Sequence, residues 1–168
     1  MENESSIAQS EQNPVLYAGF WWRFLAHIID NILISFAAGI FIFPIMGIFG
    51  LSMFSMMESG MDIEDNPVFW GSLISMYSAI FFLTLVLNWL YFAIMESSKS
   101  MGTVGKLLLK IKVTDYDYQR VSFGRATGRF FGKYVSSFIL LIGYIMAAFT
   151  ERKQALHDLM ASCYVIKE

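Results

Sequence analysis

The sequence contains little of what most enzymes and metalloproteins use. Cys163 is its only cysteine and it has two histidines, so no disulfide can form within the chain and few side chains could hold a metal. The stretch "GTVGK" is not a phosphate-binding loop, because Ser100 stands where that motif needs glycine and Leu107 where it needs Ser or Thr. We therefore expect no catalysis, no cofactor and no bound metal.

Charge is also scarce. Only 15% of the 168 residues are charged and the formal net charge is -2, which gives no reason to expect a nucleic-acid partner. By contrast, 56% of the residues are hydrophobic, with sixteen Phe and eleven Met gathered in long runs. Such runs cannot build a water-facing surface, so the composition predicts an all-α membrane protein whose main partner is the lipid bilayer.

The N-terminus lacks the cationic start and the adjoining apolar core of a secretory signal. Residues 1–14 are polar and acidic, and we expect them to form a disordered cytoplasmic tail. Residues 15–168 then form one membrane domain.

Two stretches are long enough to cross a bilayer. Residues 24–43 supply twenty residues, most of them apolar, which at about 1.5 Å each cross a hydrocarbon core of roughly 30 Å, and residues 70–95 form the second stretch. The first run continues beyond Pro44, so we expect the helix to kink or end there. In the second run Gly71, Ser75 and Ala79 recur every four residues, a spacing typical of close helix packing in lipid.

The two loops predict orientation. The connection between the spans carries only acidic charge: Glu58, Asp62, Glu64 and Asp65. The loop after the second span carries eight basic residues: Lys99, Lys106, Lys110, Lys112, Arg120, Arg125, Arg129 and Lys133. Basic loops stay on the cytoplasmic side, so we expect a multi-pass inner-membrane protein with a cytoplasmic N-terminus.

Within the basic loop, "LLLKIKV" alternates apolar and basic residues, which predicts a strand in a small cytoplasmic β-hairpin that "RVSF" would complete. The next stretch places Arg125, Arg129 and Lys133 four residues apart. On a helix they form one cationic stripe, consistent with an interfacial helix that contacts anionic lipid headgroups. A solvated basic loop explains the same charges equally well.

A third apolar segment, residues 134–149, has only sixteen uncharged positions. That is short for a span, so the segment either crosses the membrane or re-enters it, and the side of the C-terminus stays open.

Three ionisable residues lie on one face at the start of the first span. Arg23, His27 and Asp30 are spaced four and three apart, so a helix stacks them over about two turns. Asp30 then lies in the apolar zone and needs a partner. The candidates from sequence are Arg23, His27, Asn31 and Asn88, or a group brought back by the C-terminal segment.

Three blocks, "AGFWWRFLAHIIDNILI", "GTVGKLLLKIKVTD" and "TERKQALHDLMA", resemble in order the signature blocks of the RDD family of bacterial membrane proteins, over residues 16–166. The family is named for an arginine and two aspartates, which the resemblance assigns to Arg23, Asp30 and Asp158, the last beside His157. Two departures are visible. Ser162 and Cys163 replace a frequent Gly-Thr pair, and "TDYDYQRVSF" has no hairpin glycine.

The resemblance implies a multi-spanning inner-membrane protein, with cation/proton exchange proposed for some members. Two hypotheses follow for Arg23, Asp30 and Asp158. They form a buried ion-pair cluster that pins the C-terminal segment to the first span, in a scaffold or assembly role with a homo-oligomer or other membrane proteins. Alternatively, they line a path for a small ion, as in a cation/proton exchanger.

Overall fold

The computed structural model describes residues 15–60, 65–138 and 142–168, and the structural statements that follow concern those residues. The predicted tail at residues 1–14 lies outside them. The elements in chain order are β1 (Leu16–Tyr17), α1 (Phe20–Glu58), α2 (Pro67–Ser97), α3 (Val104–Leu108), β2 (Ile111–Asp115), α4 (Phe123–Phe138), α5 (Ile142–Phe149), α6 (Leu156–Met160) and β3 (Cys163–Lys167).

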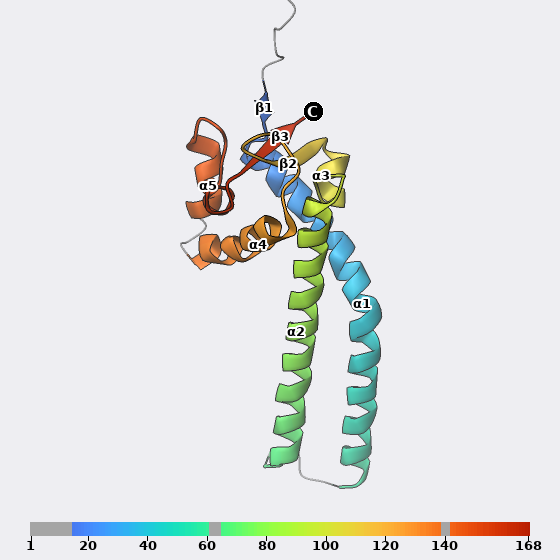
Figure 1. Cartoon of the computed structure of the whole chain (residues 1–168). Coiled ribbons are helices and arrows are strands. Elements are labelled where there is room, and N and C mark those ends of the chain that lie inside the picture. The colour runs from blue at the N-terminus through green and yellow to red at the C-terminus, as the bar shows by residue number, and fades with distance from the viewer. Residues whose placement is uncertain (1–14, 61–64, 139–141) are drawn as a thin grey trace, which may run out of the picture.

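Helices α1 and α2 form a long hairpin that extends away from the rest of the molecule (Figure 1). Both are long and apolar enough to span a membrane, and most of their large side chains are exposed, such as Phe36, Phe43 and Phe81. Exposed aromatic and aliphatic groups in these numbers are stable in lipid and not in water. Asn66 begins α2 by accepting from the Val68 amide over 2.9 Å, with Pro67 in the first turn.

Of the kink or end expected at Pro44, the end is wrong, because α1 runs unbroken through it for 39 residues. A proline in a membrane helix removes one backbone hydrogen bond, which neighbouring groups can offset. Helix α1 is about 58 Å long at 1.5 Å per residue, nearly twice the roughly 30 Å hydrocarbon core. The N-terminal part of α1 can therefore extend beyond the hydrocarbon core and pack against other parts of the protein.

That N-terminal part packs into a base formed by the sheet and the short helices (Figure 1). The sheet has the order β1-β3-β2 with both pairs antiparallel, and Val113 lies opposite Val165. The alternation in "LLLKIKV" correctly predicted a strand, since Ile111 and Val113 are fully buried. The core beneath the sheet consists of small and β-branched side chains: Ala18, Ala93, Ile111, Val113, Val121, Ala126, Ala161, Cys163 and Val165.

The predicted β-hairpin is wrong in its pairing. Strand β2 pairs with the C-terminal strand β3, and only the Thr114–Arg120 bridge joins it to the segment that follows. The turn between them needs no glycine. The Asp115 carboxylate accepts from the backbone amide of Gln119 over 2.8 Å, and Tyr118 takes the left-handed conformation at φ 58°.

The C-terminus returns to the end of the molecule where the chain enters α1. Because β3 pairs with both β1 and β2, residues 16–17, 111–115 and 163–167 share one sheet. The third apolar segment is divided between the separate helices α4 and α5, and α5 packs on α4 and α6. It does not carry the C-terminal strand away from the N-terminal one.

The expected helix at Arg125, Arg129 and Lys133 is present as α4. Its three glycines do not break it, because Phe130 and Ala126 bury against α2 and the sheet. The small residues Gly71, Ser75 and Ala79 are exposed, so close packing of that stripe occurs neither on α1 nor elsewhere in the described residues.

Candidate functional site

Asp158 lies at the centre of a buried set of charges in the base. Its carboxylate forms ion pairs with Arg23 from α1 and with Arg129 from α4, the latter over 2.8 Å. The same carboxylate accepts from the Ala155 amide at the start of its own helix, over 3.1 Å. One fully buried aspartate therefore joins α1, α4 and α6.

The set extends through Arg129 to α2 and α3. Arg129 donates to Glu96 over 2.9 Å, and Glu96 also pairs with Lys106 over 2.5 Å. We refer to Arg23, Glu96, Lys106, Arg129 and Asp158 as the charge network. It holds three cations and two carboxylates, each with at least one opposite charge within hydrogen-bonding distance.

Burial and pairing act against each other on these groups. Burial alone would raise the pKa of Asp158, but Arg129 and Arg23 hold that pKa well below its ordinary range. Burial would lower the pKa of Arg129, yet Glu96 and Asp158 raise it. Both side chains are therefore fully ionised at neutral pH. His157 lies 3.5 Å from Asp158 but stays neutral, because burial lowers its pKa to about 3.

Asp30 occupies a second site. Its oxygens accept from the hydroxyls of Tyr91, over 2.8 Å, and Thr103, over 2.5 Å, and from the amide of Gly105, over 2.8 Å. We refer to these four residues as the Asp30 site. The carboxylate is fully buried and its hydrogen-bond partners are all neutral. It is thus stabilised by donors from α2 and from the "GTVGK" segment.

Gly105 is required at that site by its close approach to α1. A Cβ there would lie 2.3 Å from the carbonyl oxygen of Ala26 and 3.0 Å from the Asp30 carboxyl. Any side chain would push α3 away from α1. The neighbouring Val104 amide donates to the Tyr91 hydroxyl over 3.1 Å. The motif that resembled a phosphate loop instead encloses a carboxylate of the protein itself.

The structure separates the residues that sequence reasoning grouped. Arg23 pairs with Asp158, whereas none of the four candidate partners from sequence donates to Asp30 within the described ranges. Asn31 lies 3.2 Å from the His27 ring nitrogen, and Asn88 donates to the Thr84 carbonyl over 2.8 Å. His157 contacts Asp158 and lies 3.4 Å from the Ser136 hydroxyl.

The expected lipid-facing stripe is also corrected. Arg129 is only 2% exposed and belongs to the charge network. Arg125 is exposed, but it lies 3.6 Å from Asp115. Lys133 is half-buried, with its ammonium 3.9 Å from the centre of the Phe92 ring. The basic residues follow one face of α4, and that face turns partly inward because the buried carboxylates lie there.

Sequence reasoning missed Glu96, Lys106, Tyr91 and Thr103. Lys106 entered the sequence analysis only as one of eight basic residues of the loop, and it is buried. Glu96 could have been singled out from the sequence, because it is an acidic residue at the end of an apolar span. A carboxylate that is buried there needs a cation as its partner. Tyr91 and Thr103 gave no such signal, since neutral donors are common. No three His, Cys, Asp or Glu side chains gather as a metal site in residues 15–60, 65–138 and 142–168.

Helices α1 and α2 are long and apolar enough to cross a membrane, and most of their large side chains are exposed. The RDD family model matches residues 17–162, so the chain belongs to the RDD family. It is 36% identical over 149 residues to the uncharacterized protein YxaI of Bacillus subtilis (strain 168), covering 89% of this chain and 96% of the relative. It is 28% identical to the uncharacterized membrane protein YteJ of the same organism, covering 90% and 82%. No solved structure matches.

Proposed function

We propose that the charge network is a structural pin, and that the protein acts as a non-enzymatic scaffold or assembly component of the inner membrane. The observation that carries the proposal is the binding of Asp158 by Arg23, Arg129 and the Ala155 amide at once. These contacts fasten the C-terminal helix to the first span. Without these contacts, few other charged side chains would hold α6 and β3 in place.

The occupancy of the carboxylates supports this role over ion transport. A transport carboxylate alternates between protonated, cation-bound and free states, so its oxygens must become available. Asp158 lies between two arginines that keep it ionised, and Asp30 already accepts three hydrogen bonds. Releasing either one would break contacts between separate helices.

The arrangement of the chain ends supports a cytoplasmic base. The sheet joins the N-terminal strand, the C-terminal strand and the loop with eight basic residues at one end of the helical hairpin. The opposite loop carries acidic charge, as expected of the outer side. A base in the cytoplasm, with the spans embedded, leaves the exposed faces of α1 and α2 for lipid, for a second copy or for another membrane protein.

The proposal is tested by comparing Asp158→Asn and Asp30→Asn with wild type in membranes. We expect both variants to accumulate less and to be digested faster by protease, because each loses buried hydrogen bonds between helices. Glu151→Gln, a change at an exposed carboxylate, serves as the control. Normal accumulation of both variants would overturn the structural role.

A second measurement separates the pin from an exchanger. The purified wild type is reconstituted in liposomes with a pH dye under imposed sodium, lithium or potassium gradients. We expect no cation-dependent proton flux from folded protein. A flux that is present in wild type and absent in a folded Asp30→Asn variant would favour transport instead.

A further inference from the structure

One cation of the base lies next to the charge network without an anionic partner of its own. Among the described residues no carboxylate lies within 4.0 Å of the Lys133 ammonium, which instead lies over the Phe92 ring. Burial lowers the pKa of Lys133 to about 7, and Glu96 only partly offsets this effect. A cation held in this way is stabilised by any anion that can reach it.

Two polar side chains of α1 lie beside this cation. The His27 ring is 6.1 Å from the Phe92 ring, the same ring that carries the Lys133 ammonium. Asn31 lies one turn further along α1 and contacts the His27 ring nitrogen over 3.2 Å. Both residues are exposed. Together Lys133, His27 and Asn31 form a cluster of donors that an external group can approach.

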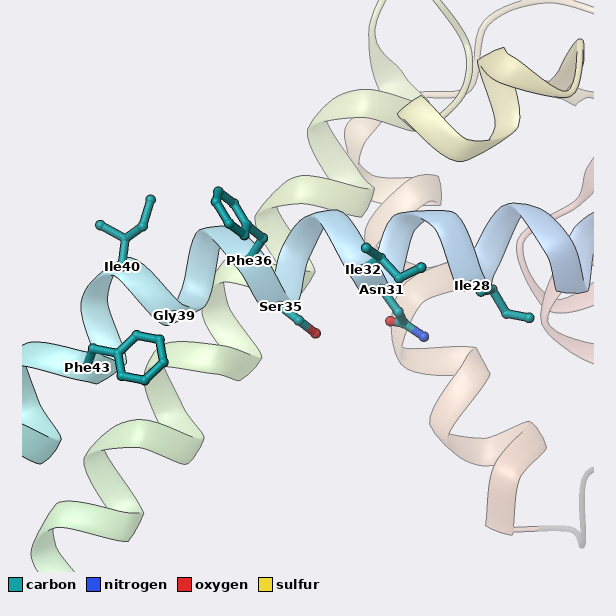
Figure 2. A pocket seen from close by; sticks show the side chains of 8 residues that line it. All are labelled: Ile28, Asn31, Ile32, Ser35, Phe36, Gly39, Ile40 and Phe43. Atoms are coloured by element: carbon teal, nitrogen blue, oxygen red, sulfur yellow. The ribbon is translucent and has the colours of Figure 1, made fainter.

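An open groove that includes the same asparagine runs along α1 from Ile28 to Phe43 (Figure 2). Its volume is about 800 Å³, and apart from Asn31 and Ser35 its lining is apolar. The apolar side chains lie before and after Gly39 along the helix: Ile28, Ile32, Phe36, Ile40 and Phe43. A Cβ at Gly39 would lie 3.4 Å from the Phe43 ring, so a larger side chain there would occupy part of the groove.

We propose that this combined surface binds one anionic phospholipid, with the phosphate on Lys133, His27 and Asn31 and an acyl chain along the groove of α1. Charge complementarity favours this occupant, because the three cations and two carboxylates of the network leave an excess positive charge next to Lys133. The order of the parts also fits. Asn31 lies toward the end of the groove nearer the base, and the apolar lining extends along α1, which is long and apolar enough to span a bilayer.

The site is distinct from the proposed pin, because none of its three donors forms an ion pair in the network. The positions of Lys133 and Gly39 therefore provide variants that leave Arg23, Glu96, Arg129 and Asp158 intact. Lys133→Gln removes the cation, and Gly39→Leu fills the groove. Their matched controls are Lys99→Gln, at an exposed lysine, and Gly71→Leu, where a Cβ meets nothing within 4 Å.

The experiment measures binding of dioleoyl phosphatidylglycerol and dioleoyl phosphatidylcholine to the full chain, by native mass spectrometry in detergent. We expect wild type to prefer phosphatidylglycerol and Lys133→Gln to lose about fivefold in its affinity, the effect of one basic residue near an anionic lipid. Lys133→Arg should retain the preference. Gly39→Leu should weaken binding of both lipids, while the two controls bind as wild type.

Several outcomes would overturn the inference. Equal binding of the two lipids by wild type would contradict the proposed phosphate site. Equal losses of affinity in Lys133→Gln and Lys99→Gln would contradict it as well. A Gly39→Leu variant that changes from dimer to monomer without losing lipid would make the groove a contact between two copies of the chain. Should Lys133→Gln fail to fold, Gly39→Leu and its control decide the question, because Gly39 lies outside the base.

Discussion

Arg129 donates to Glu96 over 2.9 Å, and both side chains are almost completely buried. This contact joins α4 to the last turn of α2, and the second donor of Arg129 reaches Asp158 on α6 over 2.8 Å. A single guanidinium thus links the spanning hairpin to the C-terminal segment. Its planar arrangement of donors suits two carboxylates at once, which a lysine cannot match.

Removing Asp158 should be strongly destabilising. Asp158→Asn leaves Arg23 with a neutral partner and Arg129 with Glu96 as its remaining carboxylate, and breaking a buried ion pair costs about 3–5 kcal/mol. The measurement is the free energy of unfolding in detergent, with Glu151→Gln as the exposed control. A loss no larger than that of the control would show that the network contributes nothing to stability.

Gly105→Ala should separate α3 from α1. The added Cβ would meet the Ala26 carbonyl at 2.3 Å, so the backbone must move, at a cost of about 1–3 kcal/mol. The Asp30 carboxylate then loses the Gly105 amide as a donor. The melting temperature is compared with that of Gly71→Ala, an open helix position where alanine should be neutral or slightly stabilising. Equal effects at the two glycines would contradict the close approach.

Stability should fall as the pH drops from 6.5 toward 4. His157 has a pKa of about 3 in the folded protein, against 6.5 for an ordinary histidine. Between these values the unfolded chain binds a proton that the folded protein does not, so folding is favoured by rising pH, with a slope of at most about 1.4 kcal/mol per pH unit. The stabilisation is complete above pH 6.5.

The variant His157→Gln tests this assignment. It removes the titrating group at the buried position and keeps His27, so any remaining slope in that pH range belongs to other groups. We expect melting temperatures measured between pH 4.5 and 7 to vary less in the variant than in wild type. Identical slopes would show that His157 is not responsible.

Ser162→Gly should stabilise the protein slightly. Ser162 follows α6 and takes the left-handed conformation, at φ 51°. A left-handed residue other than glycine costs about 1–2 kcal/mol, part of which the greater freedom of glycine in the unfolded chain offsets. Chemical denaturation of the two proteins measures the difference. A less stable glycine variant would mean that the serine side chain has a role of its own.

The sequence predicted the parts of this structure that depend on local pattern. Long apolar runs identified both spanning helices, and alternation identified strand β2. The resemblance to the RDD family is confirmed by the family model, and two of the residues that it singled out, Asp30 and Asp158, are fully buried. These features are visible without knowing which segments meet in space.

The prediction failed where distant segments had to be matched. The partner of β2 is β3, some fifty residues further along the chain, because an apolar strand pairs equally well with any other of suitable length. The partners of Asp30 are neutral groups from α2 and α3, which carry no charge signal. Arg129 was placed at the lipid surface because its spacing fitted a stripe, while the buried carboxylates that attract it were not visible in the spacing.

The central claim is that Arg23 and Asp158 fasten the first span to the C-terminal helix, and a double-mutant cycle tests it most directly. The free energy of unfolding is measured for wild type, Arg23→Met, Asp158→Asn and the double variant. We predict that the two changes are coupled by about 0.5–3 kcal/mol, the double variant being less damaged than the sum of the single ones. Strictly additive losses would contradict the claim, since they would mean that the two residues stabilise the protein independently.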